Sequence, residues 1–201
     1  DVCSSDLVII AGLILVALSS PHLIWIGFLG IAIGWFYSAK PVELMSRGIW
    51  GEISLSIAWA LITAGSYAMN NLNFNSKIAW ISLAFGVVVS TILFINQIPD
   101  IEADRQAKKM TLAATLKTTD LSKWYAVIAI SAYALLVTGI LFKQLALKYG
   151  IALIPLPWHL AIATQLHQNL ADYRVIKSCI IQTILVAHLF ALILIIINLT
   201  T

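Results

Sequence analysis

The sequence predicts an all-α fold, a polytopic bundle of about seven transmembrane helices. Of the 201 residues, 61% are apolar and only 10% are charged, against about 25% charged in an ordinary soluble domain. The mean hydropathy of +0.95 arises along the whole chain, because the few charges are gathered in short islands between long apolar runs. This composition excludes a water-soluble globule. The net charge of +3 is too small and too dispersed for nucleic-acid binding.

Seven apolar runs are candidates for membrane-spanning helices. A bilayer core about 30 Å thick is crossed by about 17 to 25 apolar residues in a helix. The runs cover residues 7–20, 22–37, 51–69, 78–98, 124–142, 151–166 and 178–199. The first run is short, and a tight turn is expected after it because Pro21 cannot continue a helix. No second domain or internal repeat is evident, so one bundle accounts for the chain.

The charged residues sort to one side of the predicted membrane. Nine of the 12 basic residues and all nine acidic residues lie on one side, in alternate connections, before the first span or, for Glu52, at the start of the third run. The basic residues on this side are Lys40, Arg47, Arg105, Lys108, Lys109, Lys117, Lys123, Arg174 and Lys177. The positive-inside rule assigns this side to the cytoplasm. We therefore expect a multi-pass protein of a bacterial or archaeal cell membrane, with any charged site on the cytoplasmic face.

The acidic island after the fourth span carries the strongest chemical signal. Asn96, Asp100, Asp104 and Lys108 recur every four residues and share one face if the segment is helical. Like charges at this spacing destabilise an isolated helix by roughly 0.2 to 0.5 kcal/mol, so the pattern favours a bound cation. Hard oxygen ligands suit Mg²⁺, which one or two carboxylates hold together with substrate phosphates. The alternative is a mixed-charge interfacial loop that only anchors the helix ends.

Two islands resemble a known family. Residues 96–112 spell N-x-x-P-D-x-E-x-D-R-x-x-x-K-x-T-L, which resembles the second aspartate-rich motif of the UbiA-type membrane prenyltransferase superfamily. Residues 37–52 are similar to the family's Tyr-Ser, Pro, Leu and Arg-Gly-x-x-Gly-Glu stretch. The resemblance covers most of the chain, with the seven runs resembling the third to ninth helices of a nine-helix fold. Lys108 stands where many relatives carry Gly, so the backbone turn at this position can differ from that of the family.

The chain also departs from the family pattern, because nothing upstream of Leu7 matches the first aspartate-rich motif. We therefore expect residues 1–201 to form one prenyltransferase-like domain that is truncated at its N-terminus, and whether these residues are active alone is left open. The hypothesis that residues 1–7 are non-native stays open.

The resemblance implies transfer of a polyprenyl group from its diphosphate to an aromatic acceptor, in quinone-type lipid biosynthesis. Dihydroxynaphthoate, the acceptor of menaquinone synthesis, is preferred over hydroxybenzoate, chlorophyllide or glycerol-phosphate acceptors. Asp100 and Asp104 would be catalytic and, with Asn96, would bind Mg²⁺. The residues implied to contact the diphosphate or the developing carbocation are Tyr37, Ser38, Arg47, Arg105 and Lys109.

Other interpretations remain. Tyr37 at a helix end is also typical of an interfacial aromatic anchor. A small cation-coupled transporter would need ionisable residues at mid-membrane on several helices, and His188 alone stands out there. A noncatalytic membrane scaffold is the third possibility, and the oligomeric state is left open. Cys3 and Cys179 show no spacing typical of a disulfide framework or a zinc site.

Overall fold

The computed structural model describes residues 4–21, 23–70 and 75–200 and belongs to the all-α class, as predicted, with two strands of two residues each. The elements are α1 (Ser4–Leu18), α2 (Leu23–Ser38), η1 (Leu44–Ser46), β1 (Arg47–Gly48), α3 (Trp50–Asn70), α4 (Ser76–Gln97), α5 (Ile101–Gln106), β2 (Met110–Thr111), α6 (Leu112–Thr115), η2 (Thr118–Asp120), α7 (Leu121–Leu141), η3 (Leu147–Leu153), α8 (Leu156–Asn169) and α9 (Tyr173–Leu199). Residues 1–3 of the segment that could be non-native, and His22 of the second predicted span, lie outside the described residues.

The seven predicted runs correspond to the seven longest helices, α1, α2, α3, α4, α7, α8 and α9. Within the described part of the chain, three segments are long and apolar enough to cross a membrane alone: Ser76–Gln97, Thr118–Leu141 and Tyr173–Leu199. The sixth helix begins later than predicted. Pro155 and Pro157 flank its first residue, and because proline is tolerated only in the first turn of a helix, α8 starts here and η3 precedes it.

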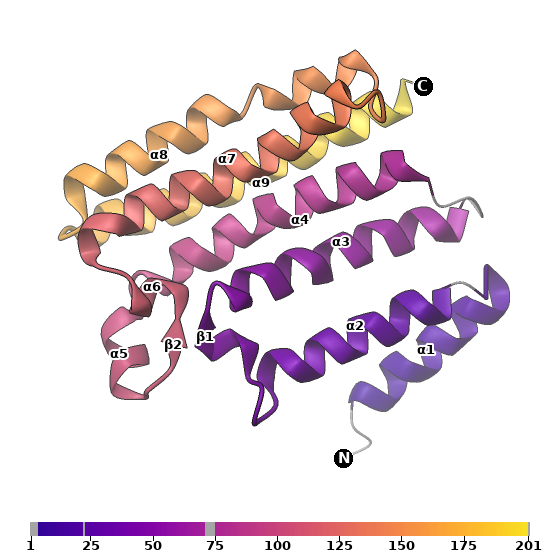
Figure 1. Ribbon diagram of the computed structural model, residues 1–201, viewed down its shortest axis with the longest axis horizontal. Coiled ribbons are helices and arrows are strands. Elements are labelled where there is room, and N and C mark those ends of the chain that lie inside the picture. The colour runs from indigo at the N-terminus through magenta and orange to yellow at the C-terminus, as the bar shows by residue number, and fades with distance from the viewer. Residues whose placement is uncertain (1–3, 22, 71–74, 201) are drawn as a thin grey trace.

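The connections alternate between the two ends of the bundle (Figure 1). The segments after α2, α4 and α8 lie at one end, together with β1, β2, α5 and α6. We call this the charged end, because residues 38–52, 97–123 and 170–177 hold most of the charged side chains. The end of α3, the start of α4, η3 and the C-terminus lie at the other end, which we call the far end.

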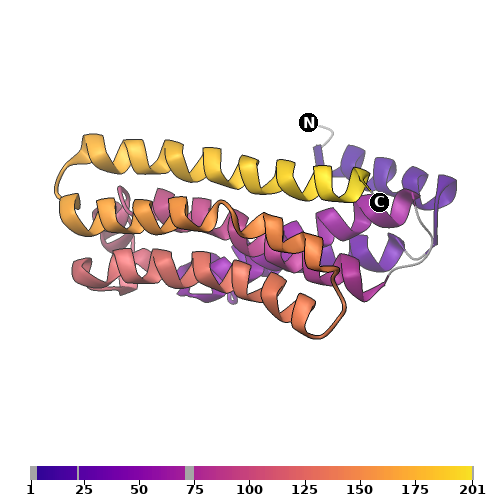
Figure 2. The same ribbon diagram turned by 90° about the horizontal axis from the view of Figure 1, so that it is seen from above.

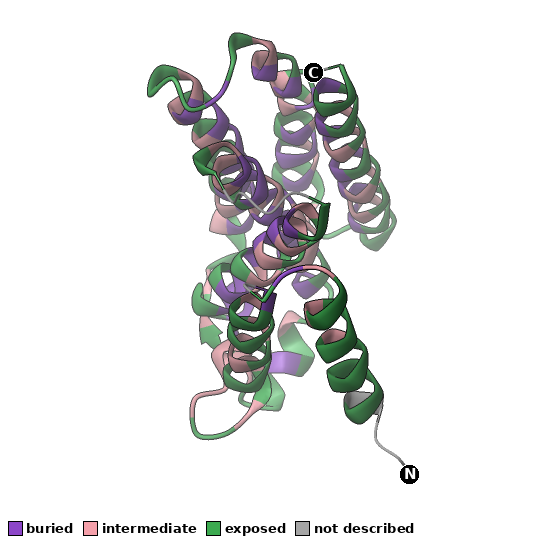
Figure 3. Ribbon diagram, turned by 90° about the vertical axis from the view of Figure 1, so that its right-hand side faces the viewer, coloured by how far each residue is buried: buried purple, intermediate pink, exposed green. Residues whose placement is uncertain are grey.

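The core lies between α4, α7, α8 and α9, which run side by side (Figure 2). Phe94, Tyr125 and Leu166 belong to one buried cluster near the charged end. Tyr133 and Phe190 belong to a second cluster, with their rings edge to face at 5.5 Å. Helices α1 and α2 add little to this core and expose most of their apolar residues (Figure 3). In a membrane protein such a surface faces lipid or another helix, so its apolar side chains are not exposed to water.

Helices α3 and α4 approach very closely at Gly86. A Cβ atom at this position would lie 2.1 Å from the carbonyl oxygen of Ser56. Small buried residues, Ala60 and Ala64 on α3 and Ser90 on α4, extend the contact in both directions. Small side chains allow such backbone contact between membrane helices. This packing brings the start of α3 next to the end of α4, where the two charged islands lie.

Candidate active site

The two charged islands are joined by a short parallel pairing of strands. In β1 and β2, Arg47 pairs with Met110 and Gly48 pairs with Thr111. Gly48 has a φ of 57°, a left-handed conformation that glycine adopts without steric cost. The pairing brings residues 37–52 and 96–112 together at the charged end, as Figure 1 shows.

The acidic island is not one continuous helix. Helix α4 ends at Gln97, and α5 begins at Ile101 after a turn that contains Pro99. Proline lacks an N–H group and cannot continue the hydrogen-bond ladder of α4. The predicted common face of four residues is therefore wrong, because Asn96 belongs to α4 and Lys108 lies beyond α5. Asp100 precedes α5 as its N-cap residue.

Asp100 and Asp104 nevertheless remain one helical turn apart, since the Asp104 N–H donates to the Asp100 carbonyl at 2.8 Å. Their side chains have different environments. Asp100 is exposed, whereas Asp104 is 9% exposed. Oδ2 of Asp104 accepts a hydrogen bond from Thr111 Oγ1 at 2.9 Å, and its Oδ1 lies 3.5 Å from Lys109 Nζ. The site thus combines one open carboxylate with one held in a fixed position.

A turn at the end of α5 returns Lys109 toward Asp104. Lys108 has a φ of 57°, in the left-handed region that favours glycine. The N–H of Lys109 donates to the Asp104 carbonyl at 2.8 Å, and the N–H of Lys108 donates to the Arg105 carbonyl at 3.1 Å. Such a left-handed helix end reverses the chain direction. The reversal places the Lys109 ammonium beside the Asp104 carboxylate.

The two arginines bind backbone carbonyls of nearby loops. Arg105 donates to the carbonyls of Ala114 at 2.9 Å and Leu116 at 3.0 Å. Arg47 donates through Nη2 to the Pro41 carbonyl at 2.7 Å and through Nε to the Val42 carbonyl. A guanidinium has five N–H donors, so these bonds leave others free for an anion.

Tyr37 and Ser38 end α2 at the same end of the bundle. Ser38 is exposed and donates to the Gly34 carbonyl of its own helix at 3.2 Å. Tyr37 is partly buried. A recess of about 440 Å³ lies nearby, lined by Pro41, Val42, Leu44, Arg47 and Trp50.

Glu52 and Gln97 link the two islands, although the sequence analysis assigned no role to either residue. Glu52, in the first turn of α3, is 3% exposed, and its Oε1 accepts a hydrogen bond from Gln97 Nε2 at 2.8 Å. Oε1 of Gln97 accepts from the N–H of Ala113 at 3.1 Å. The position of Glu52 within an apolar run was an available signal, because a carboxylate is costly there. Gln97 gave no signal of its own.

The donor set at α5 fits a hard cation. Asp100 and Asp104 offer carboxylate oxygens of the kind that Mg²⁺ prefers, whereas Asn96 lies on α4, where its Nδ2 donates to the Ile92 carbonyl at 2.8 Å. Within residues 4–21, 23–70 and 75–200, no group of three or more His, Cys, Asp or Glu side chains gathers that could hold a metal alone. The oxygens present match the type of site in which substrate phosphates and water complete the coordination.

Comparison with known sequences identifies the family. Residues 7–184 match the profile described as the UbiA prenyltransferase family. The chain belongs to this family. UbiA-family prenyltransferases generally depend on a divalent metal, in keeping with the carboxylates at α5. With its apolar helices, this family member is an integral membrane protein.

Similar curated proteins carry one name, 1,4-dihydroxy-2-naphthoate octaprenyltransferase. The protein from Mycobacterium leprae (strain TN) is 31% identical over 112 residues, which are 53% of this chain and 36% of the relative. The protein from Bacillus subtilis (strain 168) is 29% identical over 141 residues, 68% of this chain and 45% of the relative. The protein from Mycobacterium tuberculosis (strain ATCC 25618 / H37Rv) is 30% identical over 112 residues, 53% and 37% of the two chains. The matches span less than half the length of each relative, and no solved structure gives a significant match.

Proposed function

We propose that this protein transfers a polyprenyl group from its diphosphate to an aromatic acceptor, 1,4-dihydroxy-2-naphthoate, in menaquinone biosynthesis. The observation that carries the proposal is the pairing of β1 with β2, which joins residues 37–52 to residues 96–112 at one end of an apolar bundle. The name shared by the three relatives supports this acceptor. We also propose, from the positive-inside rule, that the charged end faces the cytoplasm of a bacterial or archaeal cell.

In this proposal Asp100 and Asp104 hold Mg²⁺, with the Asn96 amide oxygen as a further ligand. Bound Mg²⁺ supplies positive charge that stabilises the departing diphosphate. Asp104 is held by Thr111 and Lys109, which limits its reorientation. Asp100 is exposed and can adjust to a bound substrate.

The basic side chains of both islands lie at the charged end and would bind the diphosphate. Lys109 lies at the acidic island, and Arg47 and Arg105 retain N–H donors beyond those given to backbone carbonyls. Preorganised donors of this kind stabilise charge that develops on a leaving group. Ser38 and Tyr37 would complete the binding site, with the Tyr37 ring facing the developing carbocation, an interaction of about 0.5 to 2 kcal/mol.

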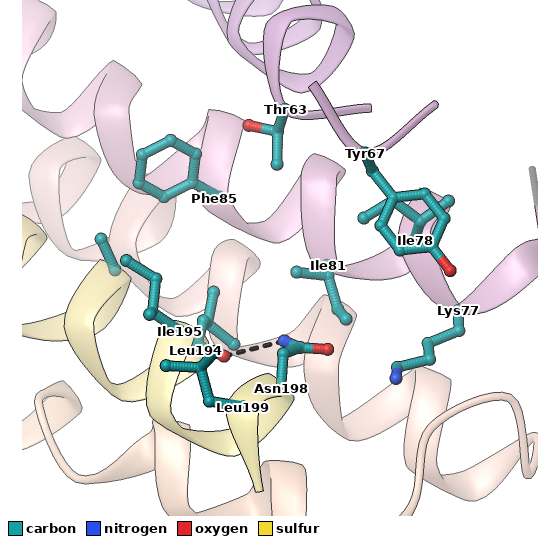
Figure 4. A pocket seen from close by; sticks show the side chains of 11 residues that line it. Thr63, Tyr67, Lys77, Ile78, Ile81, Phe85, Leu194, Ile195, Asn198 and Leu199 are labelled. Atoms are coloured by element: carbon teal, nitrogen blue, oxygen red, sulfur yellow. Dashed lines mark hydrogen bonds between the residues drawn. The ribbon is translucent and has the colours of Figure 1, made fainter. Parts of the chain in front are cut away.

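A groove near the far end offers room for the distal part of the prenyl chain. It has a volume of about 570 Å³ and lies between α3, α4 and α9 (Figure 4). Its lining is mainly apolar, with Ile78, Ile81 and Phe85 on α4. From Phe85 to Gln97 the helix rises by about 18 Å. A long polyprenyl chain whose diphosphate lies at the charged end would extend along α4 into this groove.

Filling the groove should shorten the prenyl chain that the protein accepts. Ala191 lines the groove from α9 and is partly buried. Ala191→Phe is expected to raise the KM for octaprenyl diphosphate by about 10-fold, since excluding two buried CH₂ groups removes about 1.6 kcal/mol. The KM for geranyl diphosphate should stay unchanged. The control is Ala134→Phe, at an exposed position of α7. An equal rise in KM in both variants would exclude the groove as the binding site of the prenyl chain.

The activity itself is tested with the full-length protein in membranes. Octaprenyl diphosphate, 1,4-dihydroxy-2-naphthoate and Mg²⁺ are expected to give the prenylated naphthoate, detected by mass spectrometry. Chelation with EDTA should abolish the product, and added Mg²⁺ should restore it. Product from hydroxybenzoate alone would refute the acceptor, and full turnover in EDTA would refute the metal.

A further inference from the structure

Glu52 has an environment that packing does not explain. Its side chain is 3% exposed, in the first turn of α3. Its Oε1 accepts one hydrogen bond, from Gln97, and Oε2 has no partner among the described residues. A buried carboxylate destabilises a protein unless its oxygens are hydrogen-bonded. A neutral glutamine could accept the same bond with less desolvation, so stability alone does not account for an acid at this position.

An ionised carboxylate differs from an amide in one respect: it accepts hydrogen bonds but cannot donate them. It therefore requires Gln97 to present its NH₂ group toward α3. The amide oxygen of Gln97 then faces the opposite way, toward the Ala113 N–H that donates to it at 3.1 Å. Each end of the Gln97 amide is thus fixed: its NH₂ group bonds to a group that can only accept, and its oxygen bonds to a group that can only donate.

This connection reaches the acidic island through a short segment of chain. Ala113 lies two residues after Thr111, whose hydroxyl donates to Asp104 Oδ2 at 2.9 Å. Thr111 is also the strand partner of Gly48. The path from Glu52 through Gln97 to Ala113 therefore anchors the same segment that holds the Asp104 carboxylate.

We propose that Glu52 is a positioning residue: through Gln97 and residues 111–113, its carboxylate fixes Asp104 relative to Asp100 for cation binding. The proposal rests on the proposed function of these two aspartates. Glu52 itself does not touch the cation or the substrates. Removing it should weaken cation binding, because Asp104 loses its fixed position and not its charge.

The test measures cation binding directly in the purified full-length protein, with Mn²⁺ as an EPR probe and no substrate present. Glu52→Gln is nearly isosteric, but its amide can also donate to Gln97 Oε1, so it no longer imposes one orientation on Gln97. We expect Mn²⁺ affinity to fall about 10-fold in Glu52→Gln and about 10- to 100-fold in Glu52→Ala, the range found when groups supporting metal ligands are removed. Hydrogen exchange of the Ala113 amide should be faster in both variants without metal.

The control is Ser54→Ala, at a buried position of α3 whose hydroxyl, among the described residues, bonds only to the Trp50 carbonyl of the same helix. It should keep wild-type Mn²⁺ affinity. If Glu52→Ala fails to fold, Glu52→Gln decides the question. Wild-type affinity and wild-type exchange at Ala113 in Glu52→Gln would overturn the positioning role.

The same samples separate this proposal from the proposed reaction. Wild-type protein that binds Mn²⁺ but forms no prenylated product refutes the reaction, while weaker binding in Glu52→Gln still supports the positioning role. Wild-type protein that forms product while Glu52→Gln matches its Mn²⁺ affinity refutes the positioning role alone. Wild-type protein that forms product but binds no Mn²⁺ in the absence of substrate also refutes the positioning role alone, because no cation site is then preformed for Glu52 to support.

Discussion

Replacing Asp100 or Asp104 by alanine is expected to lower prenyl transfer by at least about 10²-fold, the effect typical of losing one preorganised electrostatic contact in an active site. Each change removes a carboxylate one helical turn from the other. The two variants should differ in stability. Asp104 is buried and hydrogen-bonded to Thr111, so its loss leaves a buried hydroxyl without its acceptor, at a cost of about 1 to 3 kcal/mol. Asp100 is exposed, and its loss should leave stability unchanged.

The measurement is initial-rate prenyl transfer in membranes with equal amounts of inserted protein. Glu102→Ala is the matched control, because Glu102 is also exposed, lies on α5 and, within the described part of the chain, pairs only with Gln106 of the same helix. It should keep wild-type turnover. Wild-type turnover in Asp100→Ala and Asp104→Ala would exclude a metal-binding role for α5. An equal loss of turnover in Glu102→Ala would show that removing any negative charge from α5 lowers activity.

The helices were predictable because their signal is local. Each apolar run between charged islands became a helix, with ends that differ by a few residues. The clearest deviation is at α8, where two prolines set the start and the chain before it forms the 3₁₀ helix η3. The sidedness of the connections was also predictable, since a chain that crosses the bundle repeatedly must place alternate loops at the same end.

The sequence predicts which residues form the candidate site, but not which contacts join the segments that carry them. The sequence gives Asp100 and Asp104 at a spacing of four, and the structure keeps them one turn apart. It does not show that Pro99 ends α4, because proline is compatible with a kink, a stop or a new start. The bond between Glu52 and Gln97 depends on how α3 and α4 align, which no local pattern encodes. The strand pairing of Arg47 with Met110 is equally nonlocal.

That alignment of α3 with α4 leads to the second large effect, at Gly86. Gly86→Ala is expected to destabilise the protein by about 3 kcal/mol, the upper part of the range for overpacking. The added Cβ would lie 2.1 Å from the Ser56 carbonyl oxygen and 3.2 Å from the Ala60 nitrogen. These are backbone atoms of α3, so no side-chain rotation relieves the contact and the two helices must separate.

The measurement is the thermal unfolding midpoint in detergent, together with the rate of prenyl transfer. Gly34→Ala is the control, because it also lies inside a helix, α2, and has open space within 4 Å of the added Cβ. Alanine is the better helix former, so this control should be neutral or stabilising by up to about 1 kcal/mol. An unfolding midpoint in Gly86→Ala at or above that of wild type would contradict the close approach of α3 and α4.

The consequence for activity follows from the position of Glu52, one helical turn before Ser56 on α3. Separating α3 from α4 at Gly86 moves Glu52 away from Gln97, with which it shares a 2.8 Å hydrogen bond. Gly86→Ala should therefore reduce prenyl transfer even below its unfolding temperature, through the same loss of Mn²⁺ affinity expected for Glu52→Gln. In the double variant of Gly86→Ala and Glu52→Gln, the two losses of affinity should be less than additive, because both act on one connection. Full additivity would mean that the helix contact and the Glu52 bond support the site independently.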